Sequence, residues 1–178
     1  TLELVPEPEH GQCADCGCEL EGHSYWEGML CTPCDRLAHA SKLVPKRYRG
    51  ARIGDIPEKV RTALKGYNGK SSVYLCGGVG VGKTHIAAAT LIACSARYPM
   101  QCAWINVPTW LEEIRRSFTD DSVRPMNLSA SLTVLDDLGA EKVSDWTAER
   151  LYVAVNTAYE SERNLIVTSN LSLGQVAE

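Results

Sequence analysis

Long apolar runs are missing from this sequence. No uninterrupted apolar stretch approaches the roughly 18 residues that a membrane-spanning helix needs. The opening residues, TLELVPEPEH, also lack the basic region and apolar stretch of a secretory signal peptide. These absences predict a cytoplasmic protein without a membrane segment. Hydrophobic residues make up 44% of the 178 positions, which is ample for one full domain with a small appendage.

Basic residues are missing from the amino-terminal part of the chain, although the net charge of the whole chain is only −4. Residues 1–35 hold eight Asp or Glu and no Lys or Arg, which argues against contact between this segment and nucleic-acid phosphates. Residues 36–65 reverse the balance, with nine Lys or Arg against only Asp55 and Glu58. Such a basic run is typical either of a solvated linker or of a segment that meets phosphates.

Internal repeats and low-complexity tracts are also absent, and the chain divides into three parts. We predict a cysteine-rich module at 1–40, a basic connector at 41–70 and an α/β region at 71–178. In the third part, short β-like runs at 72–76, 102–107, 132–135 and 165–168 alternate with helical periodicity at 83–97, from 108 onward and at 145–162. This alternation predicts a parallel sheet with helices on its faces.

A glycine-rich run follows the first predicted strand. The run fits the P-loop pattern G-x-x-x-x-G-K-[ST], in which backbone N–H groups surround phosphates and the following helix points its positive end at them. Lys83 would reach the β- and γ-phosphates of ATP, and the Thr84 hydroxyl would bind Mg²⁺. The candidate nucleotide-binding residues are Gly77, Gly78, Val79, Gly80, Val81, Gly82, Lys83, Thr84 and His85.

Polar side chains follow two later strands of the predicted sheet. Asp136 and Asp137 end the run LTVLDD, which has the form of a Walker B element. We expect Asp136 to hold Mg²⁺ and Asp137 to orient or deprotonate the attacking water. Asn170 ends the run LIVTSN and is a candidate to hydrogen-bond the γ-phosphate or that water. Lys83, Asp136, Asp137 and Asn170 are therefore the candidate catalytic residues.

Four of the eight cysteines form two C-x-x-C pairs, separated by fourteen residues. This spacing is close to the four-thiolate zinc pattern, so we predict a structural Zn²⁺ held by Cys13, Cys16, Cys31 and Cys34. The alternatives are a redox pair, an iron–sulfur cluster, or a zinc site in which Cys18, His10 or His23 replaces one of these four ligands. A module of this size cannot bury enough core to fold unaided, so the metal would supply its stability. Of the other four cysteines, Cys76, Cys94 and Cys102 are predicted to be small buried hydrophobes.

Two strings carry a resemblance to a known family. The run from Val134 to Lys142, VLDDLGAEK, with Trp146 beyond it, and the run VTSNLS resemble the AAA+ ATPases of the DnaC/DnaI helicase-loader and IstB-like group. The resemblance covers residues 45–178. It implies a five-stranded parallel αβα ATPase core, with Asp136 and Asp137 as Walker B and Asn170 as sensor 1.

The same resemblance implies further features of the site. Arg47, Tyr48 and Ile53 would line the adenine pocket. An Asp at position 137, where many AAA+ proteins have Glu, implies slow hydrolysis. The arginine finger would lie beyond Glu178 and act on a neighbouring subunit, so we expect a homo-oligomer and weak ATPase activity from a single copy.

The function that we predict is loading of a replicative, DnaB-type helicase onto single-stranded DNA. The zinc module would contact the helicase, because some loaders of this group carry such a module. Two alternatives remain open at this point. One is an IstB-like transposition helper that acts with a transposase on target DNA, and the other is a regulatory ATP-binding module with little turnover.

Overall fold

A computed structural model describes residues 13, 14, 18–20, 32–140 and 144–176 of the chain. Four strands form one sheet: β1 (Val73–Cys76), β2 (Cys102–Asn106), β3 (Leu132–Leu138) and β4 (Asn164–Ser169). Their order is β1-β4-β3-β2 and all neighbours are parallel. The predicted parallel α/β fold is confirmed. The fifth strand that the resemblance implies is not among the described residues.

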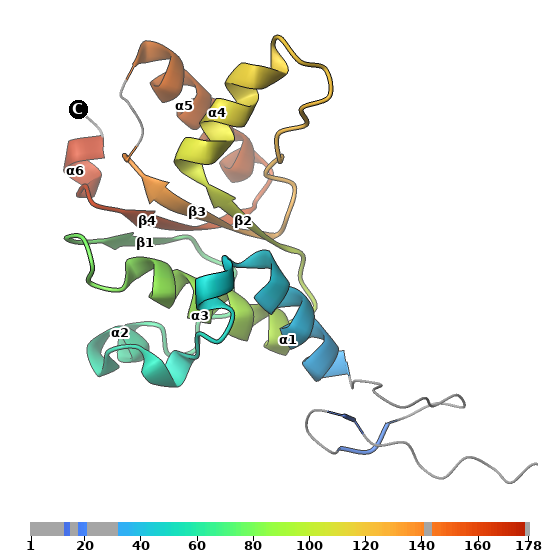
Figure 1. Cartoon of the computed structure of the whole chain (residues 1–178). Helices are drawn as coiled ribbons and strands as arrows, with labels where there is room; N and C mark the ends of the chain where they lie inside the picture. The colour runs from blue at the N-terminus through green and yellow to red at the C-terminus, as the bar shows by residue number, and fades with distance from the viewer. Residues whose placement is uncertain (1–12, 15–17, 21–31, 141–143, 177–178) are drawn as a thin grey trace, which may run out of the picture.

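The helices cover both faces of this sheet (Figure 1). On one face lie α1 (Thr32–Leu43), α2 (Glu58–Ala63) and α3 (Lys83–Arg97), with two 3-10 turns, η1 (Lys46–Tyr48) and η2 (Ile53–Asp55), between α1 and α2. On the other lie α4 (Val107–Ser117) and α5 (Asp145–Glu160), and the short α6 (Leu173–Val176) follows β4. Within the described ranges, no helix has the length and apolarity needed to cross a membrane.

Local sequence explains where the helices begin. The side chain of Asn106 accepts a hydrogen bond from the Thr109 N–H at the start of α4, and Pro108 occupies the first turn, where its missing N–H costs nothing. Ser144 begins α5 through a capping box with Thr147. In α3, small alanines and Leu91 are buried against the sheet, so this helix packs closely beneath the glycine-rich loop.

The range 41–70, expected to be a connector, takes part in the hydrophobic core. Val44, Ala51 and Ile56 are buried in the same cluster as the apolar residues of α3, together with Ala40 of α1. The Lys and Arg side chains of this range are exposed. The segment is thus amphipathic, with its apolar residues on α3 and its charges in solvent.

The three cysteines predicted to be buried differ from one another. Cys94 of α3 is buried and Cys102 of β2 is half-buried, and burial raises the pKa of each thiol to about 11. Cys76 is exposed, so the prediction is wrong for this residue. The reason is its position at the carboxyl end of β1, where the chain leaves the sheet for the glycine-rich loop.

Candidate nucleotide-binding site

A cleft of about 490 Å³ opens at the carboxyl ends of the strands. This is the edge at which parallel α/β sheets bind ligands. Most of the predicted site residues meet here, from segments far apart in the sequence. The cleft is lined by Arg47, Tyr48, Val79, Gly80, Gly82, Lys83, Thr84, His85, Asp137 and Asn170.

The glycine-rich loop turns because two of its residues take left-handed backbone conformations. Gly80 has φ 82° and Gly82 has φ 90°, values that a side chain disfavours. Gly82 directly precedes α3, whose first residue is Lys83. The backbone N–H groups at the start of a fifteen-residue helix therefore face the cleft, where the helix dipole favours negative charge.

The Lys83 side chain is 8% exposed, and its hydrogen-bond partners among the described residues are all neutral groups. Its Nζ donates to the carbonyl oxygens of Gly77 and Gly78, at 2.9 and 2.8 Å, and to Asn170 Oδ1 at 2.8 Å. Within the described residues no carboxylate forms an ion pair with this ammonium. A nearly buried cation with neutral partners favours an anionic ligand, and its position at a helix start fits a phosphate.

Asp136 and Asp137 lie at a bulge in β3. Leu135 pairs with Val167 and Leu138 with Ser169, so two aspartates on β3 face the single residue Thr168 on β4. Asp137 has φ 62°, a left-handed conformation that Asp tolerates better than most residues. The bulge gives the two carboxylates different surroundings. Asp136 is 4% exposed, whereas the half-buried Asp137 lines the cleft.

Thr168 holds this bulge together through its hydroxyl group. The hydroxyl donates to Asp136 Oδ1 at 2.8 Å and accepts from the Asp137 N–H at 2.9 Å. Sequence reasoning missed this residue. A signal was present, because Thr168 is a hydrogen-bonding side chain inside an apolar strand next to the Asn170 motif, and a buried hydroxyl needs a partner.

Burial raises the pKa of Asp136 above its usual value of 3.8, and the nearby Asp137 carboxylate acts in the same direction. Hydrogen bonds from Thr168 and Thr84 and the charge of Lys83 oppose the shift. The side chains of Thr84 and Asp136, the two residues predicted to hold Mg²⁺, are therefore close together. Hydroxyl and carboxylate oxygens are the ligand types that this ion takes, so the donor set fits it.

Two aromatic side chains form one end of the cleft. The ring of Tyr48 contacts that of His85 edge-on, with centroids 6.3 Å apart, and the Arg47 guanidinium lies 5.8 Å from the Tyr48 centroid. Arg47 and Tyr48, both implied by the resemblance to line the adenine pocket, thus lie in the cleft with His85. Ile53 does not line the cleft, because η2 turns it toward the core under α3.

The predicted zinc ligands fall mostly outside the described residues. Cys16 and Cys31 lie in ranges that the structure does not describe, while Cys13 is buried and Cys34 is half-buried. In the part of the chain that is described, no group of three or more His, Cys, Asp or Glu is arranged to hold a metal ion. The four-thiolate site stays a prediction.

Comparison with known proteins gives a family match over most of this fold. The family described as "IstB-like ATP binding protein" matches residues 58–178. Among curated proteins, the chain is 26% identical over 174 residues to the chromosomal replication initiator protein DnaA of Thermomicrobium roseum, covering 95% of this chain and 32% of that protein. The DnaA of Synechocystis is 23% identical over 155 residues, which cover 85% of this chain and 31% of that protein. The chain thus spans about a third of the length of these relatives.

Solved structures share the fold. The crystal structure of the DnaC helicase loader aligns with a TM-score of 0.63 and 24% identity, over 72% of this chain and 81% of the other. The crystal structure of DnaI aligns with a TM-score of 0.62 and 22% sequence identity, over 78% of this chain and 82% of the other. A putative primosome component from Streptococcus pyogenes also gives 0.62, with 21% identity, over 78% and 82%. Together with the family match, these similarities assign the P-loop AAA+ fold.

Proposed function

The chain belongs to the IstB-like ATP-binding proteins, and from this premise we propose that it is an ATPase that loads a DnaB-type replicative helicase onto single-stranded DNA. The observation that supports the ATPase part is that Lys83, Asp137 and Asn170 line one cleft, while the Asp136 carboxylate accepts a hydrogen bond from Thr84. The loading part is supported by the likeness to structures titled DnaC helicase loader and DnaI.

Each residue has a separate role in the proposed reaction. Lys83 and the loop N–H groups bind the β- and γ-phosphates of ATP, and Thr84 and Asp136 hold Mg²⁺, which would supply charge stabilisation. Asp137, on the cleft side of the bulge, positions the attacking water and accepts its proton. Asn170, which already bonds Lys83, orients the γ-phosphate. Tyr48 and His85 contact the adenine.

Nucleotide binding is tested with a Lys83→Ala variant. Removing charge-assisted hydrogen bonds worth about 1.5–3 kcal/mol weakens binding by about 10- to 150-fold. Isothermal titration with ATP and Mg²⁺ measures the change. Lys42→Ala is the matched control, because Lys42 is an exposed lysine of α1 outside the cleft. Equal ATP affinity of Lys83→Ala and the unmodified chain would contradict the proposed site.

Helicase loading is tested by assembly. The protein, as a homo-oligomer formed through AAA+ interfaces, is expected to copurify with a DnaB-type helicase and to increase the amount of that helicase on single-stranded DNA when ATP is present. Turnover measured with and without single-stranded DNA separates an active ATPase from the regulatory alternative. Absence of turnover under both conditions would favour a regulatory ATP-binding module.

A second function is favoured by the family match itself, whose description names IstB. In this alternative the same ATPase core helps a transposase act on target DNA. The two functions are distinguished by a copurification in which the protein is offered both a DnaB-type helicase and a transposase. Capture of a transposase and not of the helicase would replace the loading proposal and leave the ATPase proposal intact.

The cysteine module is proposed to bind one structural Zn²⁺ through Cys13, Cys16, Cys31 and Cys34. The two C-x-x-C pairs support this proposal, and the acidic character of residues 1–35 favours a protein partner over nucleic acid. Elemental analysis is expected to give one zinc per chain, and chelation is expected to abolish helicase binding while ATP binding persists. A metal-free chain that still binds the helicase would contradict this role.

A further inference from the structure

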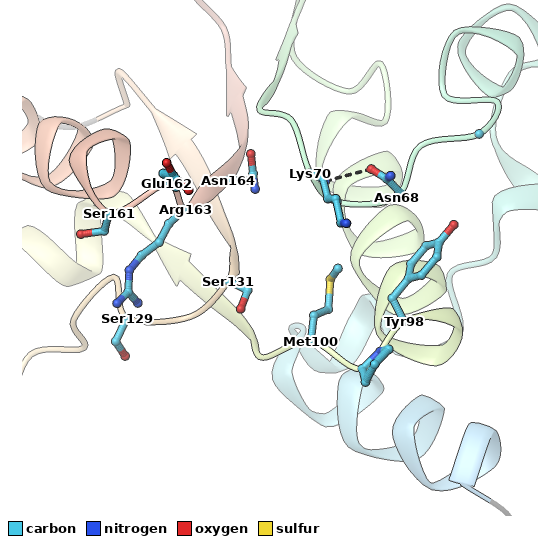
Figure 2. A pocket seen from close by; sticks show the side chains of 13 residues that line it. Asn68, Lys70, Tyr98, Met100, Ser129, Ser131, Ser161, Glu162, Arg163 and Asn164 are labelled. Atoms are coloured by element: carbon cyan, nitrogen blue, oxygen red, sulfur yellow. Dashed lines mark hydrogen bonds between the residues drawn. The ribbon is translucent and has the colours of Figure 1, made fainter.

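Three adjoining pockets run along the amino-terminal edge of the sheet, opposite the nucleotide cleft. The central pocket, about 730 Å³, is bordered by the starts of β3 and β4 and the loop before β1 (Figure 2). It shares Gly66 and Tyr98 with a pocket of about 270 Å³ beside α2 and α3, and Met100 and Ser129 with one of about 390 Å³ beside α1. We call the three together the edge groove.

The edge groove is basic, although the chain as a whole is acidic. Among the residues that the structure describes, its lining includes five Lys or Arg side chains and a single carboxylate, Glu162, whereas the net charge of the chain is −4. Within the described residues, none of these cations forms an ion pair with an acidic side chain. The five cations are Arg61, Lys65, Lys70, Arg97 and Arg163.

The central pocket combines these charges with neutral polar groups and a ring. Figure 2 shows the Lys70 amine directed into the cavity, while Arg163 extends along the opposite wall toward Ser129. Tyr98 lines the same pocket as Lys70, and Asn164 and Ser131 face the same space. Cations from two separate walls, hydroxyl donors and an aromatic ring are the groups that bind a phosphate backbone and its bases.

We propose that the edge groove binds single-stranded nucleic acid through its phosphates. This inference rests on the proposed function, in which the protein acts on DNA, and adds where the strand binds. A single strand can bend into a recessed groove and place a base against Tyr98, whereas a stiff duplex presents its phosphates on a convex surface. Because the groove and the ATP cleft lie at opposite edges of the sheet, both ligands bind at once.

The test compares salt-dependent binding of a fluorescein-labelled oligo(dT) to the full chain and to a Lys70→Gln/Arg163→Gln double variant, by fluorescence anisotropy. Each lost phosphate contact lowers the slope of log affinity against log salt by about 0.7 for a single strand. The double variant is expected to lose about 1.4 from the slope, or about 25-fold in affinity near 0.1 M salt. ATP affinity stays unchanged.

Two further variants separate charge from folding. Lys42→Gln/Arg36→Gln also removes one lysine and one arginine charge, but from α1, outside the edge groove. This variant is expected to keep the salt dependence of oligo(dT) binding of the unmodified chain. Glu162→Gln removes the single carboxylate of the lining and is expected to tighten binding, a gain that misfolding does not produce. Unchanged binding of the Lys70/Arg163 variant would overturn the inference, whatever the result with Glu162→Gln.

Other results are also decisive. If the unmodified chain binds no oligo(dT) with or without ATP, the DNA part of the proposed function fails, whereas normal binding by the groove variant refutes the groove alone. Equal affinity for a duplex of the same length would overturn the preference for single strands. Competition by polyglutamate at equal charge concentration would show a site for acidic peptides instead.

Discussion

Asp136 and Asp137 are adjacent in sequence, yet their carboxylates have different surroundings. Asp136 is buried with raised pKa beside Thr168 and Thr84, while Asp137 faces the cleft in a left-handed backbone conformation. The first arrangement suits an ion ligand and the second suits a group that meets water. The two roles proposed for these residues therefore follow from burial and backbone, at the scale of single side chains.

An Asp137→Asn variant is expected to bind ATP normally and to hydrolyse it about 10²- to 10⁴-fold more slowly, because Asn does not accept the proton of the attacking water. Asn tolerates the left-handed backbone at this position, so the fold is kept. Asp137→Val is the contrasting variant, since a β-branched residue is strained there and lowers the thermal midpoint as well. Phosphate-release assays and thermal melts measure both effects, and undiminished turnover of Asp137→Asn would contradict the role.

An Asp136→Asn variant is expected to be more stable than the unmodified chain at neutral pH, with a larger free energy of unfolding, when Mg²⁺ and nucleotide are absent. The raised pKa of Asp136 means that the folded protein holds this proton more tightly than the unfolded chain does. The unmodified protein therefore loses stability as pH rises through 3.8 toward the folded pKa, and the variant does not. Urea titrations should show that the difference in free energy of unfolding between the two proteins vanishes below pH 3.8. A variant that is less stable than the unmodified chain at neutral pH would contradict the raised pKa of Asp136.

At the scale of elements, the β3–β4 pair decides how the site is assembled. The bulge in β3 places two aspartates opposite Thr168, and the hydroxyl of that residue bonds both of them. One step further, the Ser169 hydroxyl donates to the Leu138 carbonyl oxygen at 2.7 Å and closes the end of the same pair. β4 thereby joins the acidic strand to Asn170, which reaches Lys83 across the cleft.

Replacing Thr168, which is 0% exposed, with Val keeps its shape and removes the hydroxyl. The half-buried Asp137 N–H and the buried Asp136 carboxylate each then lose a partner, and we expect the free energy of unfolding to fall by about 1–3 kcal/mol. ATP turnover should fall as well, because both aspartates shift. Thr168→Ser keeps the hydroxyl and is expected to retain turnover. Chemical denaturation measures the stability of both variants, and a phosphate-release assay measures their ATP turnover. Equal turnover of the Thr168→Val and Thr168→Ser variants would show that turnover does not depend on the Thr168 hydroxyl.

At the scale of the whole molecule, segments outside the nucleotide motifs complete the helical layer on one face of the sheet. α1 and the turns after it bury Ala40, Val44, Ala51 and Ile56 against α3, the helix that begins at Lys83. The matched family spans residues 58–178 and does not include this packing. The amino-terminal segment therefore contributes to the stability of the ATP-binding core as well as carrying basic side chains.

Val44→Ala tests this packing. Val44 is 2% exposed, and loss of two buried methyl groups is expected to lower the free energy of unfolding by about 2 kcal/mol. Val153→Ala on α5, where the side chain is 48% exposed, is the matched control and should change stability little. Urea titrations of both variants, monitored by circular dichroism, compare them. Equal stability of the two would show that the segment from α1 to η2 is not part of the core.

Sequence by itself determined the parallel α/β fold, the three helices α3, α4 and α5 and the residues of the glycine-rich loop, because hydrophobic periodicity, helix caps and glycine backbone preferences are local properties. It did not predict α1, α2 or α6. It also placed Asp136, Asp137 and Asn170 at strand ends. Only the tertiary structure decided the bulge in β3, the role of Thr168 and the edge groove. These depend on which strands become neighbours, and local sequence does not encode the register between residues that are distant along the chain.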